Sequence, residues 1–111
     1  MTEILDRIGL PAMLEQLAEE CGELTQAALK LARLRRGENP TPKTEEECLA
    51  ALIEEIADVE LCISELMMKD LVDPNKVMDI IDQKANRWLD RLKEQFDRKA
   101  GRQQAEVGEQ E

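Results

Sequence analysis

The stretch that decides the fold is residues 12–36, which read AMLEQLAEECGELTQAALKLARLRR. Its apolar residues recur at alternating steps of three and four, the spacing that gives a helix one apolar face. The residues on that face are Leu14, Leu17, Cys21, Leu24, Ala28 and Leu31. Arginines end the stretch and Gly37 follows, which suits the negative end of the helix dipole and a glycine C′ residue. The pattern predicts a helix over about residues 12–36.

Two further helices are predicted after a loop rich in glycine and proline, residues 37–42. The first covers about residues 44–69, and Thr44 followed three positions later by Glu47 is a capping-box pattern at its start. The second covers about residues 74–99 behind Asp73, with Pro74 at its first position. Its apolar residues are expected to face inward, namely Val77, Ile80, Ile81, Trp88, Leu89, Leu92 and Phe96.

The whole chain has 111 residues, enough for one domain, and no stretch alternates with the period of two that is typical of strands. We therefore predict an all-α helical bundle of three long helices plus a short N-terminal helix, residues 2–8, completed by oligomerisation. The folded domain is expected to span residues 1–100. The polar residues 101–111 are expected to form a disordered tail.

Composition excludes several classes of function. Lys and Arg number 15 against 25 Asp and Glu, a net charge of −10, and a nucleic-acid-binding protein needs a basic footprint instead. The absence of histidine excludes His-based acid–base catalysis, and His-containing zinc or di-iron sites. No apolar run reaches the roughly 18 residues of a membrane span. Cys21, Cys48 and Cys62 have no paired spacing and are expected to be reduced core residues of a cytoplasmic protein.

One group of carboxylates lies on the flank of the first apolar face. At about 100° per residue, Glu20 lies about 60° from the centre of that face, and Glu23 about 120° on the same side. Lys30 is next to Glu23 by helical angle. Gly22, in mid-helix, costs about 1 kcal/mol relative to alanine and is expected to allow close approach of another backbone.

A second group of carboxylates is Glu55 and Asp58. The main apolar stripe of this helix consists of Ile53, Ile56, Ile63 and Met67. Glu55 and Asp58 face away from that stripe, but their face also carries Cys62 and is bordered by apolar residues. A helix that is apolar on most sides is buried on most sides, so both carboxylates are expected to be partly enclosed.

Together these four carboxylates indicate a divalent cation. Enclosing them unpaired would cost several kcal/mol each. Oxygen ligands without histidine or a thiolate pair favour Mg²⁺, with Mn²⁺ as a possible substitute. The predicted ligands are Glu20, Glu23, Glu55 and Asp58. Ordinary solvated surface charge is the alternative, because a single Glu-x-x-Glu pair is common on exposed helices.

Three cations on the last helix admit two interpretations. Lys84 falls inside the apolar stripe, Arg91 lies at its edge and Arg87 flanks it. Either their aliphatic stems pack while the charged heads reach water, or the heads bind an anionic ligand at the acidic site. Phosphate oxygens accept such charge-assisted hydrogen bonds, and Lys30 would join the three.

The acidic motifs resemble those of a known family. Glu19, Glu20 and Glu23, followed on the next helix by Glu55 and Asp58, give Glu-Glu-x-x-Glu and Glu-x-x-Asp. Their flanking residues agree as well, LTQAALK over 24–30 and IEEIADV over 53–59. Over about residues 14–92 the chain resembles the MazG-type all-α nucleoside triphosphate pyrophosphohydrolases.

The resemblance implies Mg²⁺-dependent cleavage of an NTP or dNTP between the α and β phosphates, to clear unwanted nucleotides. It implies that Glu20, Glu23, Glu55 and Asp58 hold the metal, and that Glu19 and Glu54 support catalysis or engage a further ion or water. It assigns phosphate binding to Lys30, Lys84, Arg87 and Arg91. It also implies a water nucleophile and a homodimer or homotetramer.

Two alternatives stay open at this point. Many relatives carry Lys-x-x-Arg-Asn on the last helix, whereas Trp88 occupies the asparagine position here. Trp88 is then a core residue, the favoured interpretation, or a wall of the base pocket. The rival function is a non-catalytic acidic helical interaction module.

Overall fold

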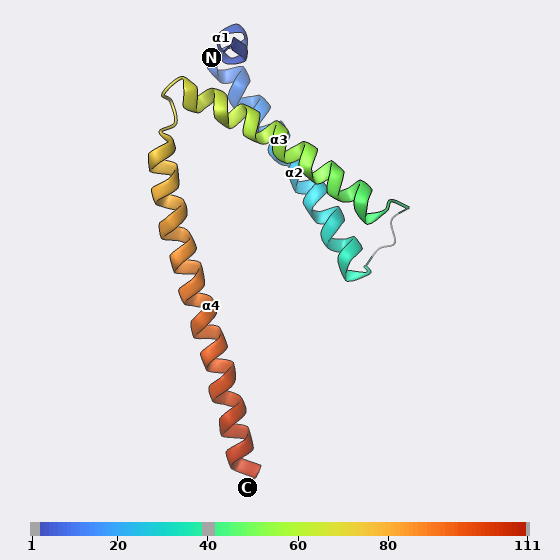
Figure 1. The fold of residues 1–111 in the computed structure, drawn as a ribbon, viewed down its shortest axis with the longest axis vertical. Helices are drawn as coiled ribbons and strands as arrows, with labels where there is room; N and C mark the ends of the chain where they lie inside the picture. Colours follow the sequence, from blue (N-terminus) through green and yellow to red (C-terminus); the bar gives the residue numbers. More distant parts are fainter. Residues whose placement is uncertain (1–2, 39–41, 111) are drawn as a thin grey trace. The chain divides into compact units, whose positions relative to one another are not determined.

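In the computed structural model, described over residues 3–38 and 42–110, the chain forms four α-helices (Figure 1). These are α1 (Glu3–Ile8), α2 (Leu10–Arg36), α3 (Glu45–Met68) and α4 (Pro74–Gln110). No strand occurs in those described ranges. The predicted all-α class, with one short and three long helices, is confirmed. Contacts divide the chain into two compact units, residues 1–72 and 73–111; the single domain over residues 1–100 stays a prediction.

The helix ends follow from local chemistry. Gly37 adopts the left-handed conformation (φ 72°) and its N–H donates to the Leu34 carbonyl, as predicted for a glycine C′ residue. At the start of α3, the Thr44 hydroxyl oxygen accepts from the Glu47 N–H at 3.2 Å, and the Glu47 carboxylate accepts from the Thr44 N–H at 3.3 Å. The predicted capping box is therefore confirmed. Asp73 caps α4 by accepting from the Asn75 N–H at 2.9 Å.

The first unit is an antiparallel pair of helices, α2 and α3, with α1 packed against one end (Figure 1). Its core is small and consists of Leu5 from α1, Met13 from α2, and Cys62 and Leu66 from α3. Leu17 and Val72 pack against this core from its margin. A fully buried Leu or Met side chain contributes about 1.5–3 kcal/mol, so Leu5, Met13 and Leu66 each stabilise the unit on that scale.

The buried faces of α2 and α3 are rotated from those predicted. In α2 the buried residues are Met13 and Ala27. Of the expected stripe, Leu17, Leu24 and Leu31 are half-buried, while Leu14, Cys21 and Ala28 are exposed. In α3 the buried face carries Cys48, Val59, Cys62, Glu65 and Leu66, while Ile53 and Ile56 are 60% and 40% exposed. The predicted stripe of α3 is therefore wrong at Ile53 and Ile56, whereas Ile63 and Met67 are half-buried. Each helix is apolar over more than one face, so the spacing of apolar residues alone did not decide which face packs against the other helix.

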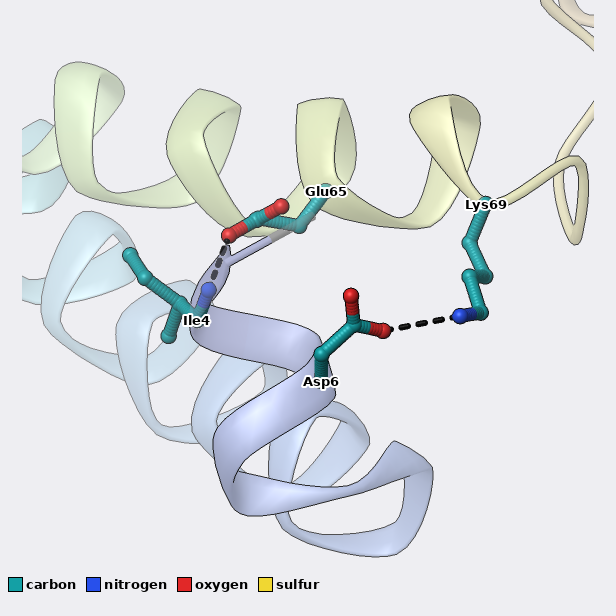
Figure 2. Close-up of polar contacts among 4 residues, drawn as sticks. All are labelled: Ile4, Asp6, Glu65 and Lys69. Atoms are coloured by element: carbon teal, nitrogen blue, oxygen red, sulfur yellow. Dashed lines mark hydrogen bonds and ion pairs between the residues drawn. The ribbon is translucent and has the colours of Figure 1, made fainter. Parts of the chain in front are cut away.

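Two polar contacts fasten α1 to the end of α3 (Figure 2). Glu65 is only 4% exposed, and its Oε1 accepts from the Ile4 N–H at 2.8 Å. Lys69 donates to Asp6 Oδ1 at 2.8 Å on the surface beside it. The Glu65 carboxylate thereby satisfies a backbone donor in the first turn of α1 that has no partner within the helix.

The second unit consists of α4 alone, and it differs from the predictions in two ways. The helix continues through Gly101 to Gln110, so the predicted helix end near residue 99 is wrong. The added residues include several with high helix propensity, and a glycine costs only about 1 kcal/mol. The apolar residues expected to face inward are half-buried at Val77 and exposed elsewhere, with Trp88 at 69% and Phe96 at 74%, because this unit holds no second element to cover them.

Candidate metal and anion site

Four carboxylates converge where α2 and α3 pack together. Glu20 and Glu23 come from one turn of α2, and Glu55 and Asp58 from one turn of α3. Each offers an oxygen, and these four oxygens all lie within 4.8 Å of one another. These are the four residues predicted from the sequence as metal ligands, because two i, i+3 pairs on antiparallel helices meet at the same level of the pair.

The donor set fits a hard divalent cation. Glu20, Glu55 and Asp58 are half-buried, as predicted for the α3 pair, whereas Glu23 is exposed. One oxygen of Glu20 and one of Glu55, both Oε2, are buried without a hydrogen-bond partner among the described residues. Such oxygens have lost water without gaining a donor, a cost that a cation relieves. Oxygen ligands such as carboxylates are those that hard divalent cations prefer.

The electrostatics of the group reflect its crowding. Gln16 donates to Glu20 Oε1 at 2.8 Å, which lowers the pKa of Glu20, but desolvation and the charges of Glu23 and Asp58 outweigh this and raise that pKa overall. Burial raises the pKa of the Cys62 thiol, and the charges of Glu20 and Asp58 add to the effect. Desolvation is the main cause that raises both pKa values, and the neighbouring carboxylate charges add to it.

A cavity of about 370 Å³ opens beside the group, toward the loop that joins α2 and α3. Its wall includes Glu23 and Glu55 of the group, and also Gln26, Lys30, Lys43 and Cys48. Lys30 was predicted to lie beside Glu23, and the structure brings both to this cavity. Lys43 was missed because it precedes α3 in the loop, where helical periodicity places no side chain.

A second, apolar cavity of about 130 Å³ borders the other two carboxylates, Glu20 and Asp58. Its walls come from α1, α2 and α3 and consist mainly of Ile4, Ile8, Met13, Leu61 and Cys62. Two of the four carboxylates therefore line the cavity with the two lysines, and the other two line the cavity with apolar walls.

Other predicted site residues are not part of this group. Glu19 and Glu54 are exposed and lie outside the four carboxylates, so their supporting role stays a prediction. Lys84, Arg87 and Arg91 line a recess of about 350 Å³ with Trp88 on α4, in the second unit. Their role toward the carboxylates also stays a prediction. The favoured core placement of Trp88 is wrong, because its side chain is 69% exposed.

Gly22 shows no close approach of another backbone in the described residues. A Cβ atom built at this glycine meets no heavy atom within 4 Å. The expectation of a tight backbone contact at Gly22 is therefore wrong within this chain. The exposed position leaves the glycine as a local weak point of α2, beside the carboxylates.

Comparisons with protein-family models, with curated proteins and with solved structures give no match for this chain. The resemblance to MazG-type pyrophosphohydrolases therefore stays a prediction from the two acidic motifs. Among the residues described, none of the helices has both the length and the apolar character that crossing a membrane requires.

Proposed function

We propose that this protein is a Mg²⁺-dependent nucleoside triphosphate pyrophosphohydrolase that converts an NTP or dNTP into the monophosphate and pyrophosphate. The observation that carries the proposal is the convergence of Glu20, Glu23, Glu55 and Asp58, with two of their oxygens buried and unpartnered. The adjoining cavity adds two lysines to this set. Carboxylates that hold a cation, next to ammonium groups, suit a polyphosphate ligand.

In this proposal, Glu20, Glu23, Glu55 and Asp58 hold the metal. When bound, Mg²⁺ would neutralise phosphate charge and lower the pKa of a coordinated water. Lys30 orients the phosphates from the adjoining cavity. Hydrolysis adds one water across the anhydride: the bridging α–β P–O bond breaks, its electron pair leaves with one product, and a carboxylate of the group accepts the proton of the water.

The cellular role that follows is removal of unwanted or non-standard nucleotides in the cytoplasm. Assembly as a homodimer or homotetramer is part of the same proposal. Exposed apolar side chains such as Ile53, Trp88 and Phe96 support assembly, because association would remove them from water.

The direct test is release of pyrophosphate from a panel of standard and damaged triphosphates. We expect turnover that requires Mg²⁺ and is lost in Glu55→Gln and Asp58→Asn variants whose circular dichroism shows a folded protein. Glu60→Gln is the matched control, since Glu60 is an exposed carboxylate of α3 outside the group. Full activity in the folded Glu55 and Asp58 variants would refute the site.

The second candidate is a non-catalytic acidic interaction module. It is favoured by the net charge of −10 and by the exposed apolar side chains of α3 and α4. Under this alternative the protein turns over none of the eight common triphosphates. Its melting temperature is also the same with and without Mg²⁺ plus a non-hydrolysable nucleotide.

A further inference from the structure

The cavity beside the carboxylates has two lysines in its wall, of which the sequence predicted only Lys30 as a site residue. Lys30 reaches it from α2, and Lys43 reaches it from the loop directly before the N-cap of α3. Because α2 and α3 are antiparallel, the end of one and the start of the other lie together. The two lysines thus line one cavity, one from α2 and the other from the loop before α3, with Glu23 and Glu55 also in its wall.

Neither lysine forms an ion pair with any residue that the structure describes. Among the described residues of the same unit, Arg35 pairs with Glu45 and Lys69 with Asp6, while Arg7, Arg33 and Arg36 form no ion pair either. What sets Lys30 and Lys43 apart is that both line one cavity. The chain has 25 Asp and Glu against 15 Lys and Arg. A shortage of carboxylates therefore does not explain why these lysines have no ion pair. Two unpaired ammonium groups at one cavity favour a ligand with several negative charges close together.

The opposite side of the carboxylate group has the reverse character. Glu20 and Asp58 border the apolar cavity, whose walls include Ile4, Met13 and Leu61. Burying phosphate oxygens against such walls would cost free energy, whereas an uncharged group would gain from it. The two cavities therefore favour one orientation of a bound ligand, with the anionic end of the ligand at Lys30 and Lys43.

We propose that Lys43, together with Lys30, forms a subsite for the diphosphate end of the ligand, the part that leaves as pyrophosphate. This inference rests on the proposed function for the identity of the ligand. Two adjacent phosphates offer enough oxygens for both ammonium groups and for the metal held by the carboxylates. A single phosphate reaches fewer of them. The subsite thus selects diphosphate over orthophosphate, and Lys43 is a binding residue of the site.

The test is calorimetric titration of the full-length protein with inorganic pyrophosphate and with inorganic phosphate, in MgCl₂. We expect pyrophosphate to bind at least about 10-fold more tightly than phosphate. Lys43→Gln and Lys30→Gln should each weaken pyrophosphate binding by about 10-fold or more, the scale of one charge-assisted hydrogen bond. Lys43→Arg should retain binding because it keeps the charge. Lys93→Gln, on α4 and outside the cavity, should leave the affinity unchanged.

The outcomes separate this inference from the proposed function. If no triphosphate is hydrolysed but pyrophosphate binding depends on Lys43, the subsite stands and the activity is refuted. If triphosphates are hydrolysed while folded Lys43→Gln keeps the wild-type KM and pyrophosphate affinity, the subsite is refuted and the activity stands. Equal loss of affinity in Lys43→Gln and Lys93→Gln would also overturn it, because general charge would then explain the binding.

Discussion

Removing the Glu55 carboxylate should stabilise the metal-free protein and destabilise the metal-bound one relative to wild type. Oxygens of Glu55 and Asp58 lie within 4.8 Å of each other. Two like charges at that distance repel by about 0.9 kcal/mol in water and about 3.5 kcal/mol at an effective dielectric constant of 20. Both residues are half-buried, so solvent screens them in part and we take the lower end, about 1 kcal/mol from Asp58 alone.

For a unit of this size, 1 kcal/mol raises the Tm by about 4–8 °C. Without divalent cations, Glu55→Gln should therefore melt several degrees above wild type. In Mg²⁺ at about 100 times its Kd, wild type gains about 2.7 kcal/mol, and the variant, which lacks one ligand, gains less. The order of the two Tm values then reverses.

Thermal unfolding followed by circular dichroism, in EDTA and then in MgCl₂, measures both effects. Glu60→Gln removes the same charge from an exposed position of α3 and should show neither effect. The reasoning would be refuted if Glu55→Gln melts below wild type in EDTA, or if Mg²⁺ raises the Tm of both proteins equally.

Further outcomes follow from the fold. Leu5→Ala should destabilise the first unit by about 2–5 kcal/mol in urea unfolding, because Leu5 is 4% exposed; Leu10→Ala, at 38% exposed, should cost far less. Thr44→Ala should cost about 1 kcal/mol in the same assay by removing the cap of α3. Alkylation followed by mass spectrometry should modify the exposed Cys21 before Cys62, whose raised pKa keeps it a thiol. The pKa of Glu20 is raised, so this carboxyl holds its proton more tightly in the folded state than in the unfolded state. The contribution of Glu20 to the stability of the metal-free protein should therefore be present at acidic pH and be lost as the pH rises through the raised pKa.

Local chemistry made much of the fold predictable. The capping box at Thr44 and the left-handed Gly37 depend on residues a few positions apart, so the sequence contains all of their partners. The convergence of Glu20, Glu23, Glu55 and Asp58 was predictable for a similar reason. Spacing of three residues fixes each pair on one helix, and a short loop brings the two helices together.

Features that depend on tertiary placement were not predictable from periodicity. Ile53 and Ile56 lie in the most apolar stripe of α3, yet the helix turns its other face to α2. Lys43 belongs to no helix, and its place in the cavity depends on the path of the loop. In the sequence, Glu65 is not distinguished from the other carboxylates of α3, because its burial depends on where α1 packs.

The attachment of α1 has a consequence for access to the carboxylates. A helix of six residues is too short to be stable by itself, and this one is held by the buried Leu5 and by contacts to Glu65 and Lys69. Local unfolding that breaks these contacts detaches α1, and amide hydrogen exchange at Ile4 reports that event. Detachment removes Ile4 and Ile8 from the apolar cavity. Water can then reach Glu20 and Asp58 from that side while α2 and α3 stay together.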